Sequence, residues 1–167
     1  ESRAAVLRAC GDKGLIKGEE VLDTATLWGA RKALSPLLRD IAPKKINEDV
    51  VVPVSALPVF LEGLEQLSSK YGVANVNFGH AGNGNIHVNL LVDPESADEL
   101  SRANACLNEI FDLVIRLNGT LSGEHGVGSE KRPYIGKEID PPTMALMKEI
   151  KMVFDPNNIL NPGKLFP

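Results

Sequence analysis

The chain has 167 residues, a length typical of one domain, and its 43% hydrophobic residues are enough to form a core. Its 22 acidic and 18 basic residues give a formal charge of −4, which excludes a strongly basic surface for nucleic acid or an anionic membrane. The longest apolar stretches are too short to cross a bilayer, and no signal-peptide pattern stands at the start. We therefore expect one cytoplasmic domain over residues 1–167, without a transmembrane segment.

The start of the chain and its cysteines give two further expectations. The chain begins at Glu1 without a methionine and already in a helix-like pattern, so we expect a piece of a longer protein. The two cysteines, Cys10 and Cys106, do not form a Cys-x-x-Cys motif. They indicate neither a disulfide framework nor a zinc knuckle, and both are predicted to be reduced structural thiols.

Apolar periodicity predicts the elements of the first part of the chain. Helices are expected over residues 2–10 and 19–39, and Pro36 should kink or restart the second because proline removes a hydrogen-bond donor. A short β-branched strand is expected at residues 50–52. Over residues 55–71 apolar side chains recur at spacings of three and four. This spacing predicts a helix whose start is capped by the serine hydroxyl.

Two strands and a long helix follow. Strands are predicted over residues 73–78 and 85–92, separated by the glycine-rich turn 79–84, whose residues tolerate positive φ. Apolar residues with helical spacing then predict an amphipathic helix over residues 95–117, with Asp93 as its cap.

The last part of the chain completes the expected fold. A short strand near residues 120–121, a helix ending near Phe154 and a turn-rich tail over residues 155–167 are predicted. The resulting β-α-β-β-α-β order is typical of an α+β fold, namely a ferredoxin-like sandwich. We expect a mainly antiparallel sheet with helices packed on one face.

The histidines are the most informative residues for function. His80, His87 and His125 are the three histidines of the chain, and all lie in two glycine-rich segments. A folded turn can bring His80 and His87 together, and glycines around Glu124 and His125 allow close approach to a ligand. Two imidazoles and one carboxylate are a known ligand set for a divalent transition metal with open positions. His80, His87 and Glu124 are thus candidate ligands, which leaves His125 as a candidate proton acceptor.

The strand between these segments also carries polar groups on one face. Asn85, His87 and Asn89 alternate with apolar residues, so their side chains share one side of the strand. We interpret this face as the floor of a pocket.

Three segments resemble a known family. Residues 78–89 (FGHAGNGNIHVN), 122–128 (SGEHGVG) and 155–164 (DPNNILNPGK) are similar, in order and spacing, to the C-terminal domain of FAD-linked oxidases of the vanillyl-alcohol-oxidase type. Members include the glycolate oxidase D subunit, D-lactate dehydrogenases and D-2-hydroxyglutarate dehydrogenase. The resemblance covers nearly the whole chain and implies an FAD-dependent 2-hydroxy-acid dehydrogenase or oxidase. It also implies that the N-terminal FAD-binding domain is missing from this chain, which alone should be inactive.

The resemblance assigns roles to the candidate residues. It implies that His80, His87 and Glu124 bind a divalent metal, usually zinc, that holds the hydroxyl and carboxylate of the substrate. It further implies that His125 takes the hydroxyl proton as the α-hydride moves to the flavin. These roles agree with the ability of a divalent cation to acidify a bound hydroxyl.

The resemblance also implies further contacts and partners. Arg31, Ser35 and Asn89 correspond to substrate-binding residues, and the planar guanidinium of Arg31 suits a carboxylate. Asn161 corresponds to a residue that approaches the flavin. Expected partners are a small 2-hydroxy acid, the missing FAD domain, an electron-acceptor protein or quinone, and a second copy in a homodimer.

Two positions depart from the family pattern. Asn83 stands where the turn usually has an aspartate, which alters the local charge more than the ligand set. Asn47 stands where the hydroxyglutarate enzymes have a lysine for the distal carboxylate, which makes a dicarboxylate substrate less secure.

Two other hypotheses are consistent with the residues. A free-standing hydrolase could use the His-His-Glu metal site, with His125 activating water. Alternatively, the chain could be a non-catalytic ferredoxin-like binding or dimerisation module in which the histidines are structural.

Overall fold

The computed structural model describes residues 23–167, and the chain divides after Leu37 into two units. Of the first unit, the structure describes the helix α2 (Thr24–Leu37), which contains Pro36 in its last turn. Asp23 caps this helix by accepting hydrogen bonds from the backbone N–H and the hydroxyl of Thr26, at 3.0 and 2.6 Å. The expected helix over residues 2–10 and the beginning of the one over 19–39 lie outside the described residues.

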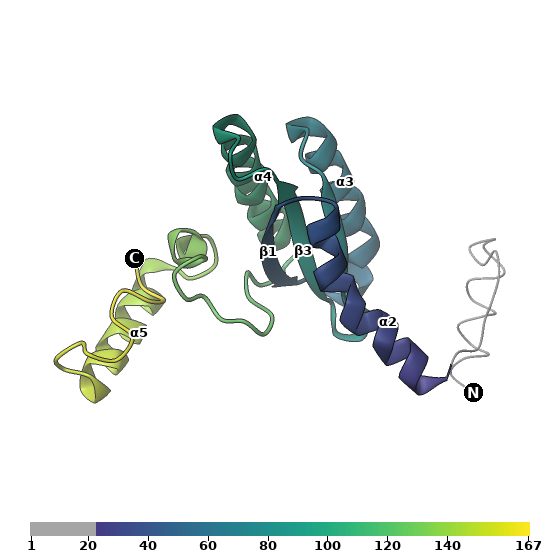
Figure 1. Cartoon of the computed structure of the whole chain (residues 1–167). Coiled ribbons are helices and arrows are strands. Elements are labelled where there is room, and N and C mark those ends of the chain that lie inside the picture. The colour runs from purple at the N-terminus through teal and green to yellow at the C-terminus, as the bar shows by residue number, and fades with distance from the viewer. Residues whose placement is uncertain (1–22) are drawn as a thin grey trace. The chain divides into compact units, whose positions relative to one another are not determined.

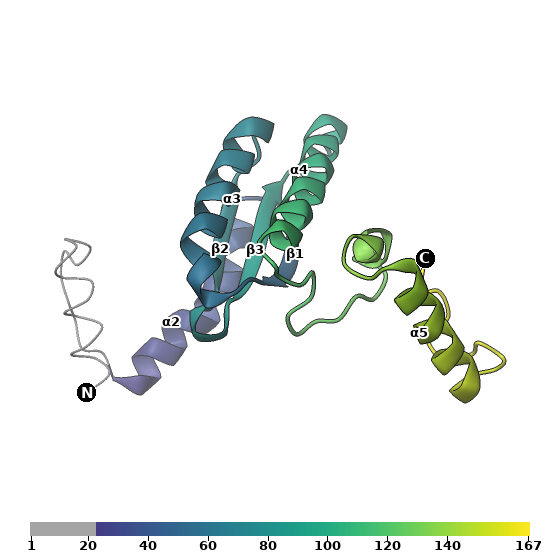
Figure 2. The same ribbon diagram turned by 180° about the vertical axis from the view of Figure 1, so that it is seen from behind.

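The second unit contains a three-stranded antiparallel sheet in the order β1-β3-β2. Its strands are β1 (Lys44–Val51), β2 (Asn75–His80) and β3 (Asn85–Val92). The helices α3 (Leu57–Tyr71) and α4 (Ala97–Arg116) lie side by side against one face of this sheet, as Figure 1 and the reverse view in Figure 2 show.

The predicted α+β class is confirmed, and the strand order explains it. An antiparallel bridge joins Val51 of β1 to Thr120, so a fourth strand is reduced to a single bridge beside β1. With that bridge, the order is the one expected for the β-α-β-β-α-β arrangement.

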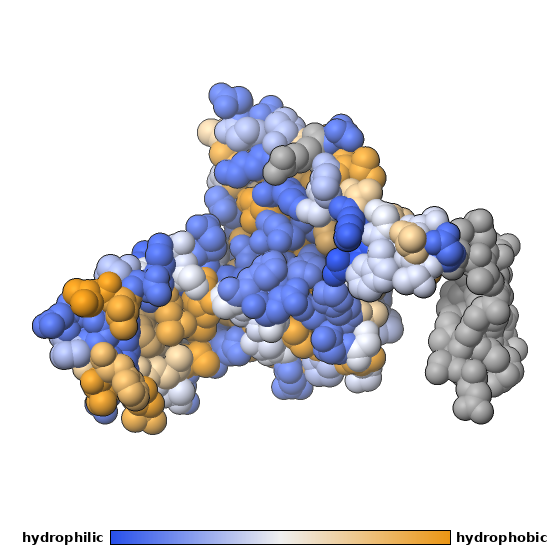
Figure 3. All heavy atoms as spheres, turned by 60° about the horizontal axis from the view of Figure 1, so that its bottom comes forward, coloured by the Kyte–Doolittle hydropathy of each residue, from blue (hydrophilic) through white to orange (hydrophobic). Residues whose placement is uncertain are grey.

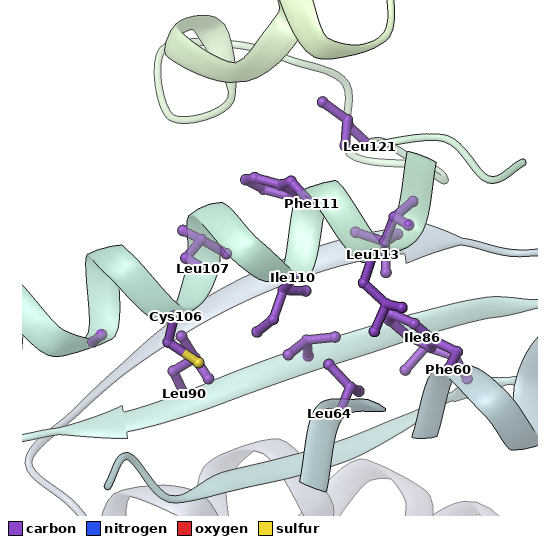
Figure 4. Packing of buried hydrophobic residues seen from close by; sticks show 14 of the residues in the cluster. Phe60, Leu64, Ile86, Leu90, Cys106, Leu107, Ile110, Phe111, Leu113 and Leu121 are labelled. Atoms are coloured by element: carbon purple, nitrogen blue, oxygen red, sulfur yellow. The ribbon is translucent and has the colours of Figure 1, made fainter. Parts of the chain in front are cut away.

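The hydrophobic core lies between the sheet and the two helices. One face of β3 contributes alternate side chains, and α3 and α4 each contribute a buried stripe, as the labelled side chains in Figure 4 show. Burial of each large apolar side chain contributes about 1.5–3 kcal/mol, so this layer holds the sheet in place. Its fully buried members include Phe60, Leu64, Val88, Leu90, Val92, Ala103, Cys106, Ile110, Phe111 and Val114.

Three local predictions were wrong in detail. β1 is longer than residues 50–52, because it pairs with β3 along its whole length despite its polar sequence. Ser55 does not cap α3, because it lies inside the 3₁₀ turn η2 (Val54–Ala56) and the cap residue is Ala56. Ser96 rather than Asp93 caps α4, by accepting from the Glu99 N–H at 3.2 Å.

The C-terminal part contains the 3₁₀ helix η4 (Arg132–Lys137), which the sequence did not predict, and α5 (Pro141–Phe154). The tail after α5 is turn-rich, as expected, and it folds around the buried carboxylate of Asp155. Figure 3 shows hydrophobic surface gathered over this part of the chain. There α5 and the tail line a mostly apolar cavity of about 780 Å³ that is open to solvent.

Two expectations from composition can be compared with the structure. Over residues 23–167 there is no helix with the length and hydropathy that a membrane crossing requires. Cys106 is fully buried against α3 and the sheet, and burial raises the pKa of its thiol to about 11. This agrees with a structural thiol, whereas Cys10 lies outside the described residues.

Candidate functional site

The face of the sheet opposite α3 and α4 carries the candidate site. Because side chains alternate along each strand, His87 on β3 lies in one cross-strand row with Asp49 on β1 and Phe78 on β2. The next row contains Asn89 with Asn47 as its neighbour on β1. The predicted polar face is therefore built from all three strands and not from β3 alone.

The β2–β3 hairpin brings the first two histidines together. The chain reverses through η3 (Ala81–Asn83) and Gly84, whose φ of +78° suits a residue without a Cβ atom. The Gly84 carbonyl accepts a hydrogen bond from the Val52 N–H at 3.1 Å, which ties the turn to β1. As a result, the rings of His80 and His87 lie 5.8 Å apart in an edge-to-face arrangement.

Glu124 reaches this pair from the glycine-rich loop over residues 122–128. Its Oε1 lies 3.2 Å from Nε2 of His87 and 3.9 Å from Nε2 of His80. The donor atoms of these three residues all lie within 4.8 Å of one another, so one metal ion can contact all of them. The structure thus brings together the three residues that the sequence selected as candidate ligands.

His125 lies beside the same cluster. Its ring stacks on that of His87, with centroids 5.4 Å apart and planes inclined by 29°. Nδ1 faces Oδ1 of Asp49 at 3.4 Å, whereas Nε2 lies 4.0 Å from Oε1 of Glu124. Nδ1 therefore faces Asp49, whereas Nε2 faces the cluster. Half of the His125 side chain is exposed.

Asp49 and Lys131 belong to the site but were missed by the sequence analysis. Asp49 is fully buried, and its carboxylate accepts hydrogen bonds from the backbone N–H groups of Glu124 and His125 and from the ammonium group of Lys131. Burial alone would raise the pKa of Asp49, but these hydrogen bonds outweigh it and lower the pKa to about 2. Asp49 is therefore an anion that anchors the loop.

Burial also changes the proton affinity of two neighbours. Burial raises the pKa of Glu48, which lies 3.6 Å from the Lys131 ammonium on the side of β1 that faces the helices. Burial lowers the pKa of His87, whose side chain is only 12% exposed, even though Glu124 acts in the opposite direction. A neutral imidazole at His87 keeps a nitrogen lone pair available to a ligand.

Asn89 lies in the row next to His87 but is fully buried. Its amide donates to the carbonyls of Val76 and His87 at 2.9 and 3.1 Å, and its oxygen accepts from Asn47 at 2.7 Å. The partly exposed Asn47 is therefore the member of this pair that lies nearer to the surface. Direct contact between Asn89 and a substrate would require Asn89 to exchange one of these partners.

A small hollow adjoins His125. It has a volume of about 240 Å³ and is lined by Asn47, Glu48 and the loop segment from His125 to Lys131. This volume is below the range typical of drug-sized ligands, so the hollow suits a small molecule.

The remaining predicted residues lie in other parts of the chain. Arg31 and Ser35 stand one turn apart on α2, in the first unit, with the Arg31 guanidinium 5.4 Å from the centre of the Trp28 ring. Asn161 lies in the C-terminal tail with a φ of +46° and lines the 780 Å³ cavity.

Comparisons with known proteins agree with the resemblance noted in the sequence. The family model for the C-terminal domain of FAD linked oxidases matches residues 1–165. The chain is 42% identical over 136 residues to glycolate oxidase subunit GlcD of Bacillus subtilis, which covers 81% of this chain and 29% of that protein. It is 35% identical over 176 residues to D-2-hydroxyglutarate dehydrogenase of Stutzerimonas stutzeri, and this match covers 99% of this chain and 37% of that protein.

A vertebrate relative is similar at the same level. The probable mitochondrial D-lactate dehydrogenase of Danio rerio is 34% identical over 139 residues, which are 83% of this chain and 27% of that protein. The chain therefore spans between 27% and 37% of the length of these three relatives.

Proposed function

Because this chain belongs to the family formed by the C-terminal domain of FAD linked oxidases, we propose that it is the substrate-binding part of an FAD-dependent 2-hydroxy-acid dehydrogenase or oxidase. The names of the three relatives described above all refer to oxidation of a 2-hydroxy acid. The observation that carries the proposal is the convergence of His80, His87, Glu124 and His125 on one face of the sheet. A hydrolase or a purely structural module receives no support from these names.

In this proposal His80, His87 and Glu124 hold a divalent metal ion, with zinc as the expected metal. The donor chemistry fits, because two imidazole nitrogens and one carboxylate oxygen converge within 4.8 Å and the site is open on one side. When bound, such an ion lowers the pKa of a coordinated hydroxyl and balances the charge of a carboxylate.

His125 is proposed as the base. The Asp49 carboxylate faces Nδ1 at 3.4 Å and favours a hydrogen on that nitrogen, which leaves the lone pair on Nε2. Nε2 accepts the hydroxyl proton of the substrate as the C–O bond becomes a carbonyl. When bound, a flavin would take up the α-hydrogen with its electron pair, and an electron-acceptor protein or quinone would reoxidise the flavin.

The remaining predicted contacts keep the roles that the resemblance implies. Arg31 pairs with the substrate carboxylate, Ser35 on the same helix face adds a hydrogen bond to the substrate, and Asn89 contacts the substrate by exchanging one of its present hydrogen-bond partners. The 240 Å³ hollow beside His125 is of a size for a small 2-hydroxy acid.

The C-terminal tail is proposed to face the flavin-binding part of the protein. Asn161 is exposed and lines an apolar cavity, and α5 next to it exposes large apolar side chains that a folded neighbour would bury. The most exposed of these side chains are Val153 and Phe154. A cytoplasmic location and a homodimer stay predictions.

An assay of the complete flavoprotein tests the proposed function. Dye reduction is measured with a panel of D- and L-2-hydroxy acids, before and after treatment with a chelator. We expect activity with a D-2-hydroxy acid, loss of that activity after chelation, and recovery with zinc or manganese. Turnover that does not respond to chelator, together with metal-free purified protein, would contradict the metal assignment.

Substitutions separate the metal ligands from the base. Glu124→Gln should lower the metal content, whereas His125→Ala should keep the metal but lower kcat by about 10²–10⁴-fold, the range for loss of a general base. Glu62→Gln, an exposed acidic residue on α3, which covers the face of the sheet opposite the site, is the matched control and should behave like the wild type. Unchanged turnover in His125→Ala would exclude this residue as the base.

A further inference from the structure

The loop that carries Glu124 and His125 is joined to the sheet through one carboxylate. The backbone N–H groups of both residues donate to the same oxygen, Oδ2 of Asp49, and the His125 contact measures 3.1 Å. The other oxygen, Oδ1, contacts the Lys131 ammonium and lies 3.4 Å from Nδ1 of His125. Asp49 thus fixes the loop backbone and faces one side chain of that loop.

Lys131 fixes the carboxylate in turn. Its side chain is 4% exposed, and its ammonium also donates to the backbone carbonyl of Asp49 at 2.6 Å. The Lys131 N–H donates to the carbonyl of Val127 at 3.1 Å, so the residue that holds Asp49 is itself attached to the end of the loop. Loop, lysine and strand therefore form a closed set of contacts.

Burial of the Asp49–Lys131 ion pair costs desolvation free energy, and a role in fixing the geometry of the loop explains why the pair is buried. Burying a carboxylate and an ammonium group carries a desolvation penalty that often equals or exceeds their mutual attraction, and apolar residues would stabilise the fold as well. A buried anion does, however, impose directions on the N–H groups that bind it. Asp49 is also the cross-strand neighbour of His87, so the loop is held directly over one proposed ligand.

We propose that Asp49, held by Lys131, is a positioning residue that sets the place of Glu124 against the two histidines and the orientation of His125. This inference rests on the proposed function, because Glu124 and His125 matter only if they bind metal and move a proton. It predicts that changing Asp49 alters the position of Glu124 and the orientation of His125, although neither residue is replaced.

The chain contains a matched control for this anchor. Asp155 is also buried, accepts from two consecutive backbone N–H groups, those of Ile159 and Leu160, at 2.9 and 3.0 Å, and contacts the Lys151 ammonium. It holds the C-terminal tail instead of the metal-binding loop. A purely structural anchor and a positioning anchor can therefore be compared within one protein.

The test uses cobalt(II) as a probe of the 167-residue chain, because its visible absorption bands report the number and geometry of ligands. Wild type, Asp49→Asn, Lys131→Gln and Asp155→Asn are titrated with cobalt, and circular dichroism verifies their folding. Asp49→Asn and Lys131→Gln should bind cobalt roughly 10–100-fold more weakly, with changed bands, as expected for loss of a group that orients metal ligands. Asp155→Asn should match the wild type.

The outcomes distinguish the two proposals. If the wild type gives no cobalt bands, the proposed metal site fails. If the wild type binds cobalt and a folded Asp49→Asn gives the same affinity and bands, the positioning role fails while the metal site stands. Equal weakening in Asp155→Asn would also overturn it, because the effect would then follow general destabilisation.

A measurement on the wild type covers the case in which the variants do not fold. Hydrogen exchange should show the amide protons of Glu124 and His125 protected, although both residues are exposed, because they donate to a buried carboxylate. Exchange at the rate of an unstructured peptide would refute the anchor itself.

Discussion

Replacing Gly84 with alanine should disrupt the hairpin that brings His80 and His87 together. A Cβ atom at this position would lie 1.9 Å from the carbonyl oxygen of Val52, and the backbone has a φ of +78°. The left-handed conformation costs a residue with a Cβ about 1–2 kcal/mol. Overpacking against a backbone atom, which cannot rotate away, adds about 1–3 kcal/mol. Gly84→Ala should therefore lower the free energy of unfolding by about 2–5 kcal/mol.

Gly82 in the same turn provides the matched control. A Cβ atom there meets nothing within 4 Å, and its φ is not positive. Gly82→Ala should leave the free energy of unfolding unchanged or raise it by up to about 1 kcal/mol, because alanine restricts the unfolded chain. The two variants differ only in which glycine of one turn is replaced.

Urea unfolding followed by circular dichroism measures both variants. The midpoint should fall for Gly84→Ala at an unchanged slope, since the surface exposed on unfolding stays the same. Cobalt binding should weaken in parallel, because the carbonyl of Gly84 and the N–H of Val52 would lose their 3.1 Å hydrogen bond. If the free energies of unfolding of the two variants agree within about 0.5 kcal/mol, the turn does not approach the end of β1 as closely as described.

Three further predictions concern other parts of the chain. A hydrogen bond from Lys151 lowers the pKa of Asp155 below its usual value of 3.8. The ionised carboxylate should therefore stabilise the tail above pH 3.8, and the tail should loosen as the pH falls through the lowered pKa. Hydrogen exchange of the Ile159 amide, which donates to Asp155, measures this loosening. Cys106, with its pKa raised to about 11, should react with a thiol reagent only after unfolding, as mass spectrometry of its peptide can detect. Ile110→Ala should cost about 2–5 kcal/mol in urea unfolding, because this side chain is fully buried; a loss below about 1 kcal/mol would contradict its place in the core.

The sequence predicted those elements whose signals are local. Periodic apolar residues located α3 and α4 to within two residues, and the alternation of polar and apolar residues from Asn85 to Leu90 located β3 (Asn85–Val92). β1 was underestimated because its first six residues, from Lys44 to Asp49, are mostly polar. Only pairing with β3 makes them a strand, and that pairing joins segments that are distant in sequence.

The candidate site was predictable in part for the same reason. The clustering of three histidines in glycine-rich segments is visible in the sequence, and it identified the residues that converge in the structure. Asp49 and Lys131 are separated by 82 positions, and nothing near either residue indicates the other. Alternation correctly assigned Asn89 to the polar face, but it cannot tell whether a side chain on that face is covered.

β3 explains why stability and function cannot be separated cleanly in this domain. Its side chains alternate between the core, as at Val88, and the polar face, as at His87, so a shift of one residue in register would exchange the two sets. The buried face makes such a shift costly in free energy, so apolar packing on the other side of the strand holds the proposed ligand His87 in register. Loss of metal binding in a variant therefore identifies a ligand only when the unfolding free energy is unchanged. The exposed Glu124, whose side chain contributes no core packing, is the position at which that distinction can be drawn most directly.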